Sequence, residues 1–398
     1  MQLPNVAELK MIRQTFQFAK SLRWDRNTTS TRTPPPIYDE LWFRWAKGLA
    51  RQNHDNSNIE TVIDMIDWNR ILETLQSDSS LAKYTDDERQ GMHLLHFVCA
   101  LHPPGSVLEL LLKSFPNAIF VQSANSGIIP LMIACGSNAA SEIIETLLKH
   151  DTSGSGATLR ITDTHGFSAV HWACREDVSS RVLQKLLLFD PMLAELIETN
   201  GSRHKITHVL FQGGRKEMLS DNQDTKLRFL LLARFKLPLD EAHFLFALHA
   251  SVALECQFPV WNYLLAECAT MGVDRDPFGN LPLHYAVQQK QHNIGEPTKQ
   301  QWSSSQLLER VLRLSPEAAS SRNRDGELPL SASLKSGFVW DKGIQALFHA
   351  YPEANCLLDP VTKLHPFCLA ASFCHDLATT FMLLRQNPEH VLQRYGSK

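Results

Sequence analysis

Two pairs of residues have the types and spacing that a metal centre or an activated thiol would use. His96 and Cys99 lie three residues apart in GMHLLHFVC, and His171 and Cys174 lie three residues apart in GFSAVHWAC. Imidazole and thiolate are ordinary zinc ligands, and an imidazole beside a thiol can activate it as a nucleophile. Because residues three apart share one face of a helix, each pair could touch. Their chemistry therefore depends on the elements that position them.

Those elements belong to a periodic pattern. Similar stretches begin with a glycine, carry a proline-like position and a histidine-like position, and end in two compact residues; they start at Gly91, Gly127, Gly166, Gly279 and Gly326. The residues at the histidine-like position, with weaker copies included, are His96, Met132, His171, His208, His249, His284, Ser331 and Cys368. Their spacing of about 35 to 47 residues is typical of helical repeat arrays.

A second signature keeps a fixed distance from the first. Leucine-rich runs with apolar residues at i, i+3 and i+4 precede FPNA, DPML, SPEA and YPEA, which begin at Phe115, Asp190, Ser315 and Tyr351. This pattern predicts a second helix that each proline ends. A loop with Asp/Asn-x-x-Gly then leads to the next short helix, which starts at the proline-like position. One such unit cannot bury its own apolar face, whereas stacked units can.

These motifs resemble the ankyrin repeat family, in a diverged form with long units like the algal members. The closest copy is DPFGNLPLHYAV (Asp276–Val287), against the family's D-x-x-G-x-T-P-L-H-x-A-A. The units are longer than the family's usual length of about 33 residues, and the Pro-Glu-Ala element is not part of its consensus. The resemblance implies an all-α solenoid of stacked helix pairs with projecting loops or short hairpins. It places about eight units in residues 61–398, with a degenerate part near 200–241.

The resemblance also bears on the His-x-x-Cys pairs. It implies that each imidazole is structural and bonds to the backbone of a neighbouring loop. His96 and His171 lie two units apart, which is roughly 16–20 Å at ordinary helix packing distances, whereas zinc ligands lie about 2.0–2.3 Å from one ion. We therefore expect no shared metal.

The cysteines are expected to pack in the core. Cys99, Cys135 and Cys174 fall at a compact position of successive units, where free cysteine behaves as a small apolar residue. A reactive thiol needs a partly exposed, electropositive setting. Cys368 and Cys374 could form a disulfide or bind a metal, but a core position is favoured. No P-loop, H-E-x-x-H or G-x-S-x-G motif occurs, so we expect no catalytic residue, no metal and no cofactor.

Composition limits the classes of partner. The 398 residues are 43% apolar and 20% charged, with a formal net charge of -3, so a basic face for phosphate backbones is not expected. No apolar run reaches the roughly 18 residues of a membrane span, and the first residues lack a signal-peptide pattern. We expect a soluble intracellular protein, cytoplasmic or nuclear, with free thiols. A monomer that binds neither nucleic acid nor membrane is favoured.

Two regions stand apart from the array. Residues 1–60 contain a partly disordered linker rich in threonine and proline, Thr28–Pro36, followed by a predicted helix, Tyr38–Ala50. That helix either caps the first unit or presents Trp42 and Trp45 to a partner. The stretch Gly213–Lys226 is predicted to be an insertion that protrudes from the array.

The array predicts a non-catalytic scaffold that binds another protein through its concave face. By the resemblance, contacts come from loop tips and from the ends of the first helices. The corresponding residues here are Asn125, Ser126, Ile128, Thr164, His165, Phe167, Arg175, Glu176, Pro277, Phe278, Asn280, Gln288, Gln289, Arg324, Asp325, Glu327, Lys335 and Ser336. Phe167 and Phe278 either anchor the partner or pack onto neighbouring loops.

Two alternatives remain open. A regulatory adaptor would carry a second docking motif in residues 1–60. An enzyme with an unrecognised site would need a cluster of titratable residues with shifted pKa values in one pocket.

Overall fold

Helices dominate the described part of the molecule. The computed structural model describes residues 35–37, 39–41, 66–86, 91–151, 156–175, 178–197, 210, 219–254, 258–267, 274–289 and 304–386. Within these ranges one antiparallel strand pair occurs, β1 (Thr85–Asp86) with β2 (Met92–His93). The predicted all-α class is confirmed. The chain divides into two compact units, Met1–Leu230 and Leu231–Lys398.

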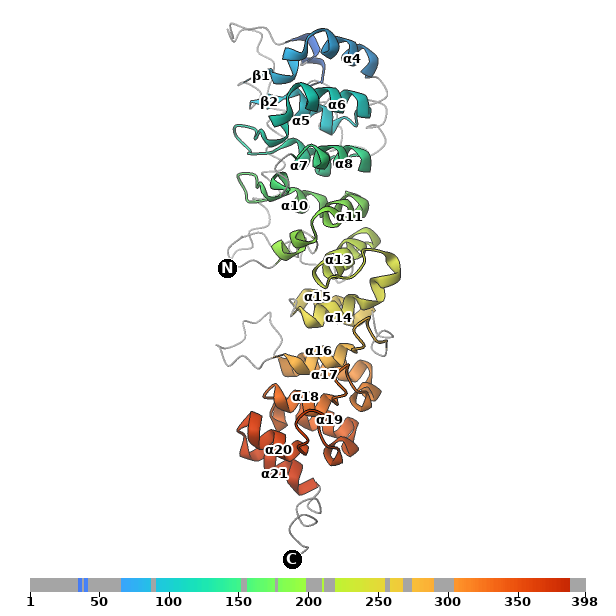
Figure 1. The fold of residues 1–398 in the computed structure, drawn as a ribbon, viewed down its shortest axis with the longest axis vertical. Coiled ribbons are helices and arrows are strands. Elements are labelled where there is room, and N and C mark those ends of the chain that lie inside the picture. The colour runs from blue at the N-terminus through green and yellow to red at the C-terminus, as the bar shows by residue number, and fades with distance from the viewer. Residues whose placement is uncertain are drawn as a thin grey trace, which may run out of the picture. The chain divides into compact units, whose positions relative to one another are not determined.

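The first unit stacks helix pairs in chain order (Figure 1). The first helices of the pairs are α5 (Leu94–Ala100), α7 (Pro130–Gly136) and α10 (Ala169–Ala173). The second helices are α6 (Gly105–Ser114), α8 (Ser141–Lys149) and α11 (Ser180–Phe189). In each series, every helix contacts the next one. The described part of this unit also contains α4 (Trp68–Ser77), η1 (Ser79–Lys83), η3 (Pro116–Phe120), α9 (Ala157–Arg160) and η4 (Pro191–Ile197), with α13 (Asp221–Arg234) crossing the division.

The second unit follows the same plan. Its first helices are α14 (Ala247–Ala253), α16 (Pro282–Gln288), α18 (Pro329–Lys335) and α20 (Pro366–Leu369), the last continued by a π-helical turn, η10 (Ala370–Cys374). Each of these first helices contacts the next. The second helices are α15 (Phe258–Glu267), α17 (Ser304–Leu314), α19 (Ile344–Ala350) and α21 (Leu377–Gln386). The described part of this unit also contains short 3₁₀ helices: η5 (Glu241–Phe246), η7 (Pro316–Ser320), η8 (Trp340–Lys342) and η9 (Pro352–Cys356).

Proline and left-handed residues set the helix boundaries. Pro130 opens α7, where its missing N–H costs nothing. Pro116 follows the end of α6 and opens η3, which confirms that proline ends this second helix. Asn138 leaves α7 with φ 57, so that Ala139 N can donate to Ala134 O at 3.0 Å. This turn satisfies a carbonyl that the helix end would otherwise leave without a partner.

The core lies between the two series of helices. Each second helix of the first unit buries two adjacent pairs of aliphatic residues one turn apart; in α8 these are Ile143, Ile144, Leu147 and Leu148. Burying one such side chain stabilises the fold by about 1.5–3 kcal/mol. The first helices contribute compact residues, such as Ala134 and Cys135, that are fully buried. These compact residues let neighbouring first helices approach closely.

Part of the predicted insertion is instead built into the core. Residues 221–226 of the stretch Gly213–Lys226 begin α13, and Lys226 is fully buried, with its ammonium donating to Arg175 O. A protruding insertion is therefore wrong for these residues, while residues 213–218 lie outside the described ranges. Leu41 of the predicted capping helix is fully buried, whereas Trp42 and Trp45 lie outside those ranges. The capping role stays a prediction.

Candidate partner-binding surface

A recurring polar turn shapes the loop that precedes each of several first helices. In the loop before α16, Asp276 Oδ1 accepts hydrogen bonds from Phe278 N at 3.0 Å and Asn280 N at 2.8 Å. Gly279, with φ 82, closes the turn in a conformation that side chains disfavour. Asp163 and Asn323 accept the same pair of bonds in their own loops. The predicted Asp/Asn-x-x-Gly loop is confirmed at these three places.

Side chains tie each loop to the next one. Gln122 Nε2 donates to Gly127 O in its own loop and to Thr162 O in the following loop, both at 3.1 Å. Arg275 makes the equivalent pair of bonds in the second unit, with Nη1 donating to Gly279 O at 2.5 Å and to Arg322 O at 2.8 Å. In each unit, side chains thus link neighbouring loops into one surface, which we call the platform.

The histidines of the motif connect helices to loops. His96 Nδ1 accepts from His93 N at 3.1 Å, and its Nε2 lies 3.1 Å from Val121 O and 3.3 Å from Ile128 O in the next loop. His284 repeats this arrangement, accepting from Leu281 N at 2.8 Å and reaching Ser321 O at 3.0 Å. A carbonyl at Nε2 requires the proton on that nitrogen. The predicted bond of the imidazole to a neighbouring loop is confirmed at His96, and His284 makes the same bond. At His171 the structure shows the bond from Ser168 N to Nδ1, at 3.1 Å.

Burial keeps these imidazoles neutral. It lowers the pKa of His96 to about 4, with a smaller effect from the neighbouring His93, and it also lowers the pKa values of His249 and His284. A neutral ring can accept at Nδ1 and donate at Nε2 at the same time. The ring is therefore a connector rather than a proton carrier.

Cys99, Cys135 and Cys174 lie in the core, as predicted, whereas Cys368 and Cys374 are half-buried, so the favoured core position is wrong for these two. Cys99, Cys135 and Cys174 are fully buried, and burial raises the pKa of each thiol, that of Cys174 to about 12. Cys368 and Cys374 are free, so a disulfide between them is wrong, and Cys374 Sγ instead donates to two backbone carbonyl oxygens. Within the described ranges, no group of three His, Cys, Asp or Glu side chains could hold a metal ion.

Aromatic rings from three segments gather on the platform of the second unit. The ring of Phe235 meets the ring of Phe278 edge-on at 5.7 Å and that of Tyr285 at 5.5 Å. The Tyr285 hydroxyl donates to Asp276 Oδ2 at 2.6 Å, which fixes this ring to the loop. Phe278 stays 40% exposed. We call Phe235, Phe278 and Tyr285 the aromatic cluster.

The first unit has a smaller counterpart. Trp172 follows the motif histidine as Tyr285 does, and its Nε1 lies 3.4 Å from Asp163 Oδ2. The Arg175 guanidinium lies 5.7 Å from the centre of the Trp172 ring, a cation–π contact. Phe167 is half-buried and meets His171 edge-on at 5.6 Å. Of the two predicted aromatic tips, Phe278 offers the larger exposed fraction.

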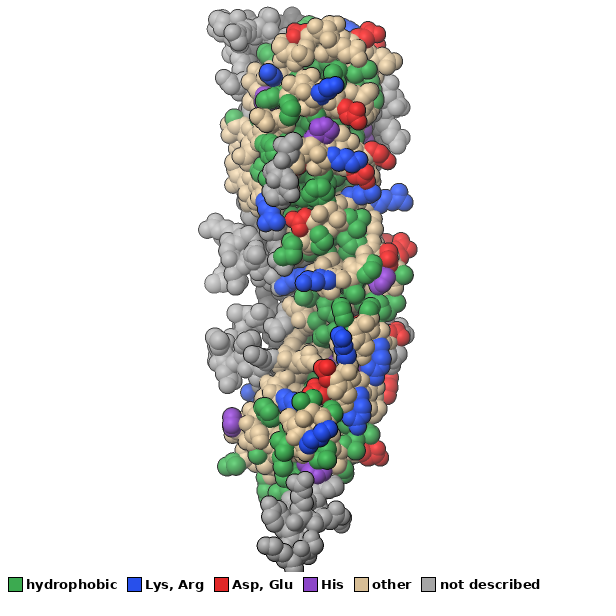
Figure 2. Space-filling model, viewed as in Figure 1, with side chains coloured by type: hydrophobic (Ala, Val, Ile, Leu, Met, Phe, Trp, Pro, Cys, Tyr) green, Lys and Arg blue, Asp and Glu red, His purple; other side chains and the backbone are tan. Residues whose placement is uncertain are grey.

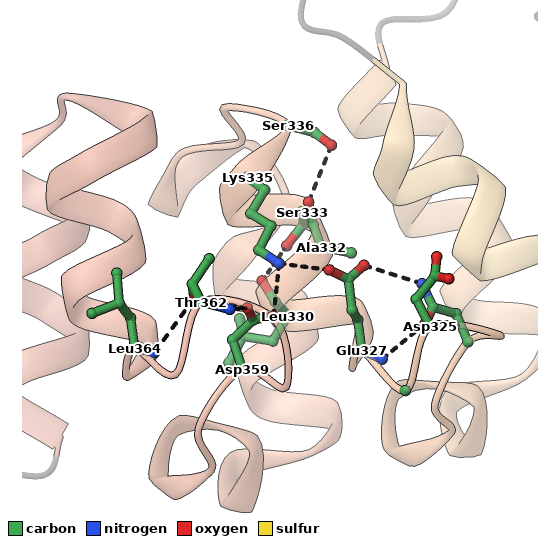
Figure 3. A network of polar contacts seen from close by, with 12 residues as sticks. Asp325, Glu327, Leu330, Ala332, Ser333, Lys335, Ser336, Asp359, Thr362 and Leu364 are labelled. Atoms are coloured by element: carbon green, nitrogen blue, oxygen red, sulfur yellow. Dashed lines mark hydrogen bonds and ion pairs between the residues drawn. The ribbon is translucent and has the colours of Figure 1, made fainter.

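A charged network joins two loops at α18 (Figure 3). Lys335 Nζ lies 2.5 Å from Glu327 Oε1 and 2.8 Å from Asp359 Oδ1. Asp359 is fully buried, and its other oxygen accepts from Thr362 N and Oγ1. The pKa of Asp359 is lowered because hydrogen bonds from Lys335 and Thr362 outweigh the opposing effect of burial. Glu327 and Lys335 thus hold the structure together, in addition to any contact with a partner.

The predicted contact residues divide by exposure. Those with exposed side chains are Asn125, Thr164, Pro277, Phe278, Gln288, Arg324 and Asp325. Those that are half-buried are His165, Phe167, Arg175, Asn280, Glu327, Lys335 and Ser336. Glu176 lies outside the described ranges.

Three predicted contact residues are buried, which corrects the expected exposure. Ser126 packs its hydroxyl 2.5 Å from that of Ser123. Ile128 turns inward, where its N–H bonds to Ser123 Oγ at 3.0 Å. Gln289 is 7% exposed and donates from Nε2 to Val252 O in the preceding first helix. These three side chains offer almost no surface to a partner.

Charge on the visible face is mixed. In Figure 2, Lys and Arg side chains alternate with Asp, Glu and apolar side chains. Within the described ranges, no helix combines the length and apolar character that crossing a membrane requires. Neither observation singles out a class of ligand, so the arrangement of the loops carries the functional argument.

Comparison with known proteins adds no assignment. No protein-family model matches the chain, and no curated protein matches it.

Proposed function

We propose that this chain is an ankyrin-type helical repeat protein that binds another protein, without catalysis, through its loops and first helices. Support for the repeat type comes from the recurring Asp/Asn-x-x-Gly turn and from three motif histidines, His96, His249 and His284, which each bond to the following loop. In this proposal the stack supplies rigidity and the loop side chains supply specificity.

The observation that carries the proposal is the aromatic cluster. Phe278 would be expected to fold away from water if it served only stability, yet it stays 40% exposed on a ring framework built from Phe235 and Tyr285. Rigid, partly exposed aromatic side chains are the usual centres of protein interfaces. The hydrogen bond from Tyr285 to Asp276 orders the Tyr285 side chain before binding, so less of its conformational entropy is lost when a partner binds.

The test compares capture of a partner by the full chain and by two variants. The variant Phe235→Ala/Phe278→Ala removes the cluster, and Leu377→Ala/Phe381→Ala is the matched control, because both of its side chains are exposed apolar residues of the same unit. We expect the control to keep the partner and the cluster variant to bind it at least about 30-fold more weakly, as for an interface hot spot of about 2 kcal/mol. Circular dichroism first establishes that all three proteins are equally folded.

A partner that binds the cluster variant as tightly as the wild type would refute the proposed surface. Deleting residues 1–60 then tests the adaptor alternative, because an adaptor loses one of two partners while a single-surface scaffold keeps its only one. Most of residues 1–60 lie outside the described ranges.

A further inference from the structure

The loops of the two units differ in charge although they share one bonding scheme. In the first unit, Gln122 bridges its own loop and the next one with two hydrogen bonds from an uncharged amide. In the second unit, Arg275 makes the same two bonds, and Arg322 makes the first of them, with Nη1 donating to Gly326 O at 2.7 Å. An amide makes the same bridge in the first unit, so linking the loops does not by itself require the positive charge of the second unit.

Both guanidinium groups are held in place and face water. Arg275 and Arg322 are exposed side chains, and within the described ranges neither forms an ion pair with a carboxylate. Each uses one nitrogen for the loop, which leaves the other side of a planar fork for an external acceptor. Arg324, also exposed, lies on the next loop tip, and its N–H approaches Asn280 Oδ1 at 3.5 Å.

The acidic residues of these loops are mostly engaged inside the protein. Asp276 accepts two backbone N–H groups and the Tyr285 hydroxyl, and Asp359 is buried against Lys335. The exposed acids of these loops are Asp274 and Asp325. The exposed side chains of these loops therefore include three arginines, Arg275, Arg322 and Arg324, and two aspartates. Phe278, an exposed apolar residue, lies in the same loop as Arg275.

We propose that Arg275 and Arg322 bind carboxylates of an acidic segment of the partner protein, while an apolar residue of that segment covers Phe278. This inference rests on the proposed function and names the chemistry of its partner. Guanidinium and carboxylate groups match in geometry, so a fixed guanidinium binds a carboxylate without first losing its own freedom. The loops of the first unit, whose bridging residue is Gln122, lack this preference.

The test uses a fluorescent peptide in which glutamates flank a central pair of phenylalanines, and a second peptide in which glutamines replace the glutamates. Arg275→Gln/Arg322→Gln removes both charges but keeps an amide, as in Gln122, so the loops should stay linked. Arg313→Gln/Lys342→Gln removes two exposed charges from other elements of the same unit and is the matched control. Fluorescence anisotropy with the full chain measures each affinity.

We expect the wild type and the control to prefer the glutamate peptide, and the Arg275→Gln/Arg322→Gln variant to bind it about tenfold more weakly, since two exposed charge pairs are lost. Equal binding of the two peptides by the wild type, or equal loss in the control, would overturn the proposal. Tighter binding of a single-stranded DNA oligonucleotide than of the glutamate peptide would overturn it in favour of a general polyanion site.

A second comparison separates this inference from the proposed function. If Phe278→Ala loses the natural partner while Arg275→Gln/Arg322→Gln keeps it at full affinity, the scaffold function stands and the acidic partner is wrong. If neither variant changes capture of the partner, both proposals fail.

Discussion

Lowering the pH should destabilise the first unit, because the buried ring of His96 stays neutral in the folded protein at pH values where it is protonated in the unfolded chain. The ring is fully buried, accepts from His93 N and donates toward Val121 O and Ile128 O, so a second proton would remove an acceptor and bury a charge. Its pKa is about 4, against an ordinary value of 6.5. As pH falls, the unfolded chain therefore takes up this proton first. The stability that neutral His96 provides is complete above pH 6.5 and is lost between pH 6.5 and about 4.

The size of this loss follows from the shift. A displacement of about 2.5 pH units corresponds to about 3 kcal/mol at 1.36 kcal/mol per unit. Met132 occupies the equivalent, fully buried position of the next first helix, so His96→Met is a replacement that the fold already accommodates. That variant removes the ring from His93 N and Val121 O, whereas Ile128 O keeps the N–H of Ser123 at 2.9 Å. We expect it to be less stable than the wild type by about 2 kcal/mol at neutral pH.

The assay is urea unfolding at several pH values between 7.5 and 4, monitored by tryptophan fluorescence. The free energy of unfolding of the wild type should fall by about 3 kcal/mol more than that of His96→Met over this range, so the wild type, the more stable protein by about 2 kcal/mol at neutral pH, becomes the less stable one by about 1 kcal/mol near pH 4. Asn125→Ala, at an exposed and uncharged loop residue of the same unit, is the control and should keep the pH dependence of the wild type. A constant difference between His96→Met and the wild type at every pH would refute the neutral, buried imidazole.

Three further substitutions test packing and charge. Gly136→Ala would place a methyl group 2.5 Å from the Trp172 ring and should destabilise the first unit by about 1–3 kcal/mol, whereas Gly105→Ala meets no atom within 4 Å and should be neutral or stabilising in the same thermal unfolding experiment. Lys335→Met should cost about 2 kcal/mol, because it leaves the buried Asp359 carboxylate without its cation; an unfolding free energy within about 0.5 kcal/mol of the wild type would show that the network is not stabilising.

Local signals in the sequence predicted much of the fold. The proline-like position places the starts of α7, α16 and α18 at Pro130, Pro282 and Pro329, because proline is compatible with a first turn wherever it occurs. The motif histidine predicted a bond to the next loop, and the bond is present at His96 and His284. Each of these signals depends on residues close together in the chain.

The candidate surface was harder to predict because it depends on contacts between distant residues. The position of Gln289 at the end of its helix predicts an exposed side chain. Its amide instead donates to Val252 O in another helix, and the side chain is buried. Phe235 joins Phe278 across 43 residues, as the difference of their numbers gives, and no local pattern marks that meeting. One available signal was overlooked: the residue that follows the motif histidine, Trp172 or Tyr285, faces the loop aspartate in both units.

The bonds that two motif histidines and two bridging side chains make to the next loop share one direction along the chain, and that direction bears on synthesis. The imidazoles of His96 and His284 and the side chains of Gln122 and Arg275 all bond to carbonyl oxygens that lie later in the sequence. During translation, these four side chains therefore lack their acceptors in the next loop until that loop has been synthesised. A pause just after a motif histidine would hold a helix whose imidazole has no acceptor, whereas a pause after the next loop would hold a completed layer.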